Sequence, residues 1–156
     1  DYLTGNTDIS AEQIMIAANY SGQAINITQT TAAHAMSYML TSIYNLPHGH
    51  AVAICLPHIW RYMNDHLDQC IDKRGKHYLK SIFEDISNAM GCRSVEEAIR
   101  AFERMMIELG MKNPMRQSVD DIKTLTSLVN IDRLNNNPVR LDEETLFNLY
   151  NIIVGG

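Results

Sequence analysis

Residues 30–60 read TTAAHAMSYMLTSIYNLPHGHAVAICLPHIW, and this stretch decides the fold. Apolar residues at helical spacing predict one helix that ends near Asn45 and a second helix that opens at Gly49. Pro47 lies between them, and proline cannot continue a helix because it lacks a backbone N–H. The two helices are therefore expected to fold back on each other as an αα-hairpin.

Four of the six histidines lie within this hairpin: His34, His48, His50 and His58. His34 lies on the first helix and His48 lies at the start of the second. The hairpin can bring these two side chains close together. Two imidazoles that converge on one point supply half of a metal site. Spacing alone leaves a second reading open, in which both histidines are hydrogen-bonded core or surface residues. No carboxylate or thiolate stands near them to complete the site, and Cys55 lies two turns into the second helix.

The composition is that of an ordinary globular protein, with 156 residues, 46% hydrophobic and 20% charged. The net charge of −5 and the lack of a basic cluster argue against a nucleic-acid partner. Three cysteines without CxxC spacing predict reduced thiols and a cytoplasmic protein. The most apolar run, residues 51–60, is too short to span a bilayer, and no signal peptide is predicted.

Caps and periodicity predict an all-α fold of about seven helices in a single domain. Capping boxes open helices at Ser10 and Ser94, Gly91 ends the helix before Ser94, and Gly110 ends the helix that Ser94 opens. No strand-like alternation interrupts them. The predicted helices cover residues 10–25, 30–45, 49–64, 76–90, 94–109, 118–128 and 142–153, and residues 131–140 are predicted to form a loop.

The first predicted helix has an unusually small face. It carries Ala17, Ala18, Ser21, Gly22 and Ala24. Small residues allow another helix backbone to approach closely, so this helix is expected to be central in the fold.

The hairpin sequence resembles the C-terminal helical domain of the iron-containing (group III) alcohol dehydrogenases, which share the dehydroquinate synthase-like fold. The resemblance rests on three motifs: His34-Ala-Met-Ser-Tyr38, Pro47-His48-Gly49 and Leu56-Pro57-His58. Thirteen residues separate His34 from His48, as they separate two metal-binding histidines of that family. The resemblance extends back over Ala11–Ala33 and forward to Asn137-Pro138. It therefore covers nearly the whole chain and implies that residues 1–156 form one metal-binding helical domain.

The resemblance implies a two-domain enzyme that moves a hydride between NAD(P) and an alcohol or aldehyde. In that family a Rossmann-like domain binds the nucleotide, and the helical domain binds one divalent metal, Fe²⁺ or sometimes Zn²⁺, as a Lewis acid. His34 and His48 match the two later metal ligands. The family's other two ligands, an aspartate and a histidine four residues apart, have no counterpart here. The chain is thus expected to lack the N-terminal domain, to hold an incomplete metal site, and to be inactive alone. An apolar face of the first helix is expected to be exposed, so that self-association to a homo-oligomer is plausible.

Tyr38 stands where many members of the family carry a further histidine. It lies on the same helix face as His34, four residues on. Its phenol is a candidate catalytic and substrate-binding group that donates to a substrate oxygen, and the alternative is that it only packs. Loss of a histidine here also removes a proton relay.

His50 lies in the first turn of the second helix, where the helix dipole favours anions. It is a candidate substrate-binding residue, with a capping or solvent role as the alternative. Together with Arg133-Leu-x-Asn-Asn-Pro, these motifs are most similar to the branch assigned as phosphonoacetaldehyde reductases. That branch implies a dianionic aldehyde as substrate.

Two other functions fit the same residues. One is a helical binding or interaction module in which the histidines are structural. The other is a phosphonate-binding domain without redox chemistry.

Overall fold

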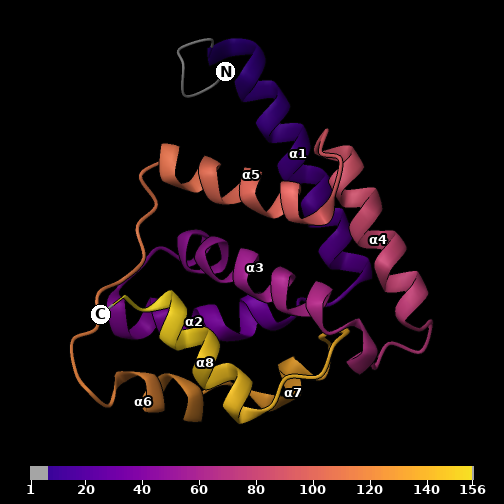
Figure 1. Ribbon diagram of the computed structural model, residues 1–156. Coiled ribbons are helices and arrows are strands. Elements are labelled where there is room, and N and C mark those ends of the chain that lie inside the picture. Colours follow the sequence, from indigo (N-terminus) through magenta and orange to yellow (C-terminus); the bar gives the residue numbers. More distant parts are fainter. Residues whose placement is uncertain (1–6, 156) are drawn as a thin grey trace. The chain divides into compact units, whose positions relative to one another are not determined.

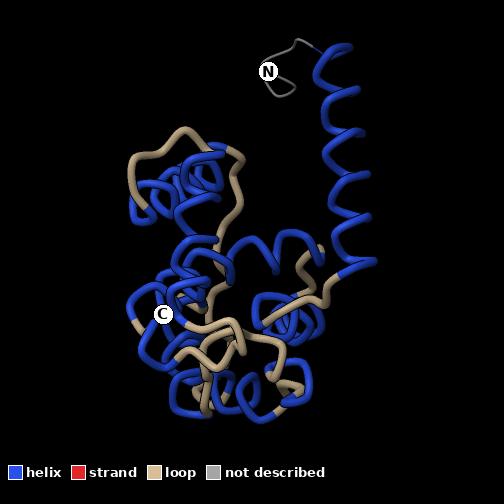
Figure 2. The backbone as a smooth tube through the Cα atoms, turned by 90° about the vertical axis from the view of Figure 1, so that its right-hand side faces the viewer, coloured by secondary structure: helices blue, strands red, loops and turns tan. Residues whose placement is uncertain are grey.

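The structure is a computed structural model that describes residues 7–155. The predicted all-α fold is confirmed: the described part contains eight α-helices and one 3₁₀ turn, η2 (Figures 1 and 2). Two isolated β-bridges, Cys70 with Val139 and Met115 with Gly155, are the strand-like pairings recorded in that part. The elements are α1 (Thr7–Ile27), α2 (Ala32–Tyr44), α3 (His48–Asp65), η2 (Leu67–Gln69), α4 (Lys76–Ala89), α5 (Val95–Glu108), α6 (Asp121–Ser127), α7 (Ile131–Leu134) and α8 (Glu143–Ile153).

Helix α1 belongs to a unit of its own, residues 1–30, and the other elements form a second unit, residues 31–156. The predicted first helix is present as α1, and its expected central position stays a prediction. The predicted self-association through this helix stays a prediction.

Helices α2 and α3 form the predicted αα-hairpin and pack along each other. Asn45 ends α2 in the left-handed region at φ 53°, a conformation that asparagine tolerates better than most residues. Pro47 then serves as the N-cap of α3 with φ −54°. Helix α3 consequently begins at His48, one residue earlier than predicted, so His48 occupies the first helical position.

Local signals fix most of the remaining helix ends. The Ser94 hydroxyl accepts a hydrogen bond from the Glu97 backbone N–H at 3.2 Å, and the Asp142 carboxylate accepts one from the Thr145 backbone N–H at 2.8 Å. The Glu97 carboxylate accepts from the Arg93 N–H at 2.9 Å, one residue before the position that a capping box would use.

Two boundaries in the C-terminal half differ from the prediction. Helix α6 begins at Asp121, because the Asp121 carboxylate accepts the backbone N–H groups of Gln117 and Ser118 and closes a turn there. The predicted loop 131–140 opens with the four-residue helix α7, which raises the count above the seven predicted.

Helix α8 closes the core of the second unit. Its Tyr150, Ile153 and the following Val154 have no exposed surface. The Tyr150 hydroxyl donates a hydrogen bond of 2.9 Å to the Met36 carbonyl of α2. This contact ties the C-terminal helix to the helix that carries His34.

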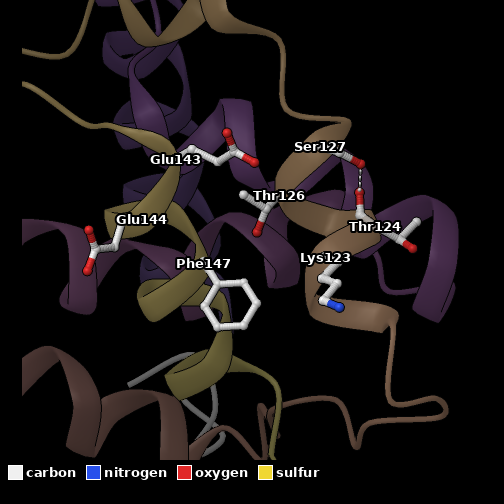
Figure 3. A pocket seen from close by; sticks show the side chains of 7 residues that line it. All are labelled: Lys123, Thr124, Thr126, Ser127, Glu143, Glu144 and Phe147. Atoms are coloured by element: carbon white, nitrogen blue, oxygen red, sulfur yellow. Dashed lines mark hydrogen bonds between the residues drawn. The ribbon is translucent and has the colours of Figure 1, made fainter.

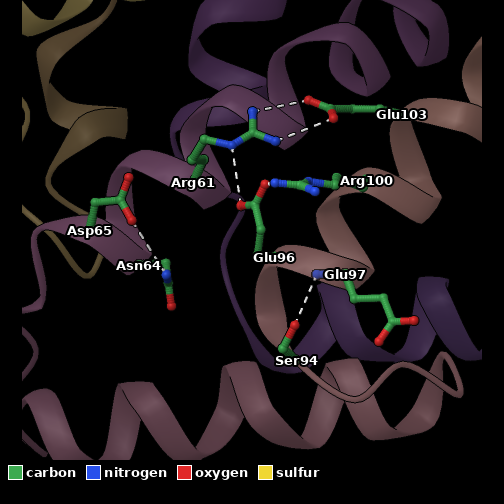
Figure 4. A network of polar contacts seen from close by, with 8 residues as sticks. All are labelled: Arg61, Asn64, Asp65, Ser94, Glu96, Glu97, Arg100 and Glu103. Carbon is green, nitrogen blue, oxygen red and sulfur yellow. Dashed lines mark hydrogen bonds and ion pairs between the residues drawn. The ribbon is translucent and has the colours of Figure 1, made fainter.

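A polar network joins α3 to α5 (Figure 4). The Arg61 guanidinium donates to both carboxylate oxygens of Glu103, at 3.0 and 3.2 Å, and to Glu96 at 3.4 Å. Arg100 also donates to Glu96, at 2.8 Å. Arg61 and Glu103 are about two-thirds buried, with 32% and 29% of their side chains exposed, so solvent screens this pair less than a fully exposed one.

We expect Arg61→Ala to lower the free energy of unfolding by about 1 kcal/mol, since it removes a two-pronged carboxylate contact. Urea unfolding at low salt measures the change. Lys80→Ala is the matched control, because it removes an exposed pair within one helix, Lys80 to Glu84 at 3.7 Å. Equal effects of the two variants would contradict a special role for the α3–α5 contact.

His58 of α3 is half-buried next to this network. Burial lowers its pKa from the ordinary value of 6.5, the Glu103 charge raises it, and the Arg61 charge lowers it further. The unfolded chain therefore binds more protons than the folded chain just below pH 6.5. We expect the free energy of unfolding to fall as the pH drops below 6.5, and His58→Gln to flatten that slope. Unfolding midpoints between pH 5 and 8 test this, and identical slopes for both proteins would refute it.

Candidate metal centre

One face of α2 carries the residues of the candidate site. His34 and Tyr38 are four residues apart, so helix geometry stacks them on one face. Ser37 lies beside them and is fully buried. Helix α3 begins directly after the turn of the hairpin and supplies His48 to the same place.

The two predicted metal ligands lie side by side. The ring centroids of His34 and His48 are 5.5 Å apart, with the planes inclined by 62°. The Tyr38 ring stacks on His48 at 5.2 Å with an interplanar angle of 24°. A metal–nitrogen bond is about 2 Å long, so two imidazoles must lie about this close to bind one ion. The rings therefore meet a geometric condition for sharing a cation.

Ser37 lies next to the second ring. Its hydroxyl donates to the His34 carbonyl at 2.9 Å, which leaves its lone pairs free to accept. The Ser37 oxygen lies 3.5 Å from His48 Nδ1, at the long end of hydrogen-bond distance. With the proton on Nδ1, Nε2 of His48 carries the free lone pair that a metal needs.

His34 is held in its neutral form. Burial lowers its pKa below 6.5, and the nearby charges of His48 and Arg133 lower it further. A neutral imidazole is the form that binds a metal. At neutral pH, His34 therefore needs little deprotonation before binding.

The donor set fits half of a metal site. Imidazole nitrogens suit Fe²⁺ and Zn²⁺, but a protein site for either ion normally has three or more protein ligands. Within residues 7–155, no cluster of three or more histidine, cysteine, aspartate or glutamate side chains has the spacing to hold a metal ion. A complete site therefore needs ligands beyond this pair.

Arg133 joins the site from α7. Its guanidinium carbon lies 4.5 Å from the centre of the Tyr38 ring, and its Nη1 donates to the Tyr38 hydroxyl. The Tyr38 ring therefore contacts both the His48 ring and the Arg133 guanidinium. The sequence marked Arg133 as part of a motif but assigned it no role, because it lies 95 positions from Tyr38 in the chain. No local pattern reports such a contact.

His50 has a partner elsewhere. Its Nε2 lies 2.8 Å from the Lys112 carbonyl, in the segment after α5. A carbonyl only accepts, so Nε2 carries the proton and the neutral ring keeps Nδ1 as an acceptor. The bond ties the first turn of α3 to that segment.

A surface pocket of about 750 Å³ lies apart from the histidine pair, between α6 and α8 (Figure 3). The residues that line it are Lys123, Thr124, Thr126, Ser127, Glu143, Glu144 and Phe147. None of the predicted site residues contributes to this lining.

Comparison with known families shows which family the chain belongs to. The family model described as "Fe-containing alcohol dehydrogenase family, C-terminal" matches residues 2–154. The chain belongs to the iron-containing alcohol dehydrogenase family. The resemblance inferred from the hairpin motifs is thereby confirmed, and so is the assignment of this helical fold to the C-terminal domain of the family.

The chain is also similar to individual proteins with established names. The chain is 33% identical over 131 residues to a phosphonoacetaldehyde reductase of Streptomyces viridochromogenes, covering 83% of this chain and 33% of that protein. It is 30% identical over 113 residues to a 1,3-propanediol dehydrogenase of Klebsiella pneumoniae, covering 67% of this chain and 26% of that protein. The chain thus spans about a third or less of the length of these relatives.

Two solved structures share the fold. A sulfoacetaldehyde reductase from Bifidobacterium kashiwanohense, solved in complex with NAD⁺, superposes with a TM-score of 0.64 at 23% identity. It matches 80% of this chain and 31% of its own. A 1,3-propanediol oxidoreductase gives a TM-score of 0.61 at 24% identity and matches 78% of this chain and 32% of its own.

Within residues 7–155, none of the helices has the length and apolar content to cross a membrane.

Proposed function

We propose that this chain is the metal- and substrate-binding part of an NAD(P)-dependent alcohol dehydrogenase that works as an aldehyde reductase. His34 and His48 hold one divalent cation, Fe²⁺ or Zn²⁺, and the remaining ligands come from outside this chain. The observation that carries the proposal is the distance of 5.5 Å between the ring centroids of His34 and His48. The chain that holds them belongs to the iron-containing alcohol dehydrogenase family. The substrate class follows the named relatives, which are reductases and dehydrogenases of small alcohols and aldehydes.

The bound cation supplies Lewis acidity toward the substrate oxygen. The chain's own residues orient the partners of that step. The Ser37 oxygen lies 3.5 Å from His48 Nδ1, where it can accept a hydrogen bond from that nitrogen, and Tyr38 packs against the His48 ring. The Tyr38 oxygen accepts a hydrogen bond from Arg133, so its own O–H proton remains available to donate to a substrate oxygen. We infer that this phenol helps to orient the substrate.

The nicotinamide nucleotide belongs to the rest of the whole protein. The sequence contains no glycine-rich dinucleotide motif, and the chain spans about a third of its named relatives. The NAD⁺ complex of the sulfoacetaldehyde reductase supports a nicotinamide cofactor for this family member as well. Three free cysteines support a reducing, cytoplasmic setting.

His50 fits a structural role better than the predicted substrate role. In the neutral ring its only N–H is already donated to Lys112, so it offers a substrate anion no hydrogen bond. We infer that His50 holds the segment after α5 against the start of α3.

The proposal is tested on the full-length protein. We expect metal analysis to find one divalent ion per chain, and NAD(P)H oxidation to depend on added aldehyde and on that ion. The isolated chain of 156 residues is expected to lose its metal on dialysis and to show no turnover. Metal retained at one equivalent by the isolated chain would contradict the half-site.

Two outcomes with the full-length protein would favour the other readings. A metal-free protein that turns over no aldehyde would favour a helical interaction module. Tight binding of 2-hydroxyethylphosphonate without any NAD(P)H oxidation would favour a phosphonate-binding domain.

A further inference from the structure

Arg133 combines a fixed position with unused donors. The Tyr38 ring lies 4.5 Å from its guanidinium carbon, and one N–H of the guanidinium is used on the Tyr38 hydroxyl. A guanidinium has five N–H groups in a planar fork. In the part of the chain that the structure describes, no carboxylate lies within ion-pair distance of Arg133. Most of its hydrogen-bonding capacity is therefore open to a ligand.

The backbone around Arg133 also supports this position. The Arg133 N–H lies 3.2 Å from the Asn130 carbonyl and 3.4 Å from the Asn130 side-chain oxygen, which together cap the first turn of α7. Helix α7 packs on α2. The side chain is thus delivered to the α2 face from a short helix that is itself held against α2.

Arg133 lies close to the candidate metal centre. Tyr38 lies between Arg133 and His48 and contacts both. A substrate whose oxygen lies at the histidine pair would therefore have its far end near a cation, about one side chain away.

This arrangement suits an aldehyde that carries an anion. We propose that Arg133 is the specificity-determining residue of the site and selects aldehydes with a phosphonate or sulfonate group near the reacting carbon. The proposal deepens the function proposed above and rests on it. The planar fork matches two oxygens of a tetrahedral oxyanion, and stacking on Tyr38 fixes its direction before the ligand arrives. A neutral aldehyde gains nothing from this contact.

The test uses full-length enzyme and three aldehydes: phosphonoacetaldehyde, sulfoacetaldehyde and propanal. We expect Arg133→Leu to lower kcat/KM for phosphonoacetaldehyde by roughly 10- to 100-fold, mainly through KM, because a charge-assisted contact is lost. The loss for the singly charged sulfonate should be smaller, and propanal should change by less than about threefold. Arg133→Lys should recover part of the loss, since it keeps the charge but not the fork.

Arg104→Leu is the matched control, because Arg104 is also exposed but lies on α5. It should leave all three substrates unchanged. An equal loss for all three aldehydes in Arg133→Leu would overturn the proposal and show that Arg133 only supports Tyr38. Unchanged kinetics with all three would overturn it as well.

A binding measurement separates this proposal from the proposed function. Calorimetric titration with 2-hydroxyethylphosphonate needs no turnover. If the wild-type protein reduces no aldehyde, the proposed function fails, but a weaker affinity in Arg133→Leu than in Arg104→Leu still supports anion selection. Equal affinities in the two variants would refute it.

Discussion

Replacing His48 with alanine in the full-length protein is expected to remove the bound metal and to lower aldehyde reduction by more than 100-fold. Mutation of a group that only supports a metal ligand costs about 10- to 100-fold, so the loss of a ligand should cost more. His34→Ala should behave in the same way, because its ring lies 5.5 Å from that of His48. The double variant should lose little beyond either single variant, since the two residues act as a unit.

Metal content after dialysis and kcat/KM on the same preparations measure this effect. His77→Ala is the control, because His77 is an exposed histidine of α4. It should keep both metal and activity. If both ligand variants kept one metal per chain and full activity, the two histidines would be structural and the dehydrogenase chemistry would lie elsewhere.

Replacing Tyr150 with alanine is expected to lower the free energy of unfolding by about 3–5 kcal/mol. The side chain has no exposed surface, so its removal leaves a cavity among α2, α3 and α8. Domains of this size have only about 5–15 kcal/mol of stability in total. The loss would therefore be a large share of it, and a lower unfolding temperature and urea midpoint should report it.

Tyr150→Phe separates the hydrogen bond from the packing. Burial raises the pKa of Tyr150 well above its ordinary value, so the hydroxyl stays protonated and donates to the Met36 carbonyl at 2.9 Å. We expect this variant to cost about 1 kcal/mol. A cost close to that of Tyr150→Ala would contradict the view that packing is the larger contribution.

Short-range signals explain how much of the fold could be predicted. Ser94, Asp142 and the glycines at 91 and 110 act on helix ends only a few residues away, and the structure has those ends within one or two residues. The corner at Pro47 likewise placed His34 and His48 on adjacent helices. In contrast, α7 was missed, because a single turn with three asparagines after it carries no periodic pattern.

The sequence by itself determined most of the helices, the hairpin, and the placing of His34 and His48 on its two helices. Caps, prolines and helical periods act over only a few residues, so a local pattern reports them. Only the tertiary structure decided what surrounds that pair. The contacts of Tyr38 with Arg133, His50 with Lys112 and Tyr150 with Met36 join residues 95, 62 and 114 positions apart. Such contacts depend on how several helices pack at once, and no local pattern of side chains encodes that packing.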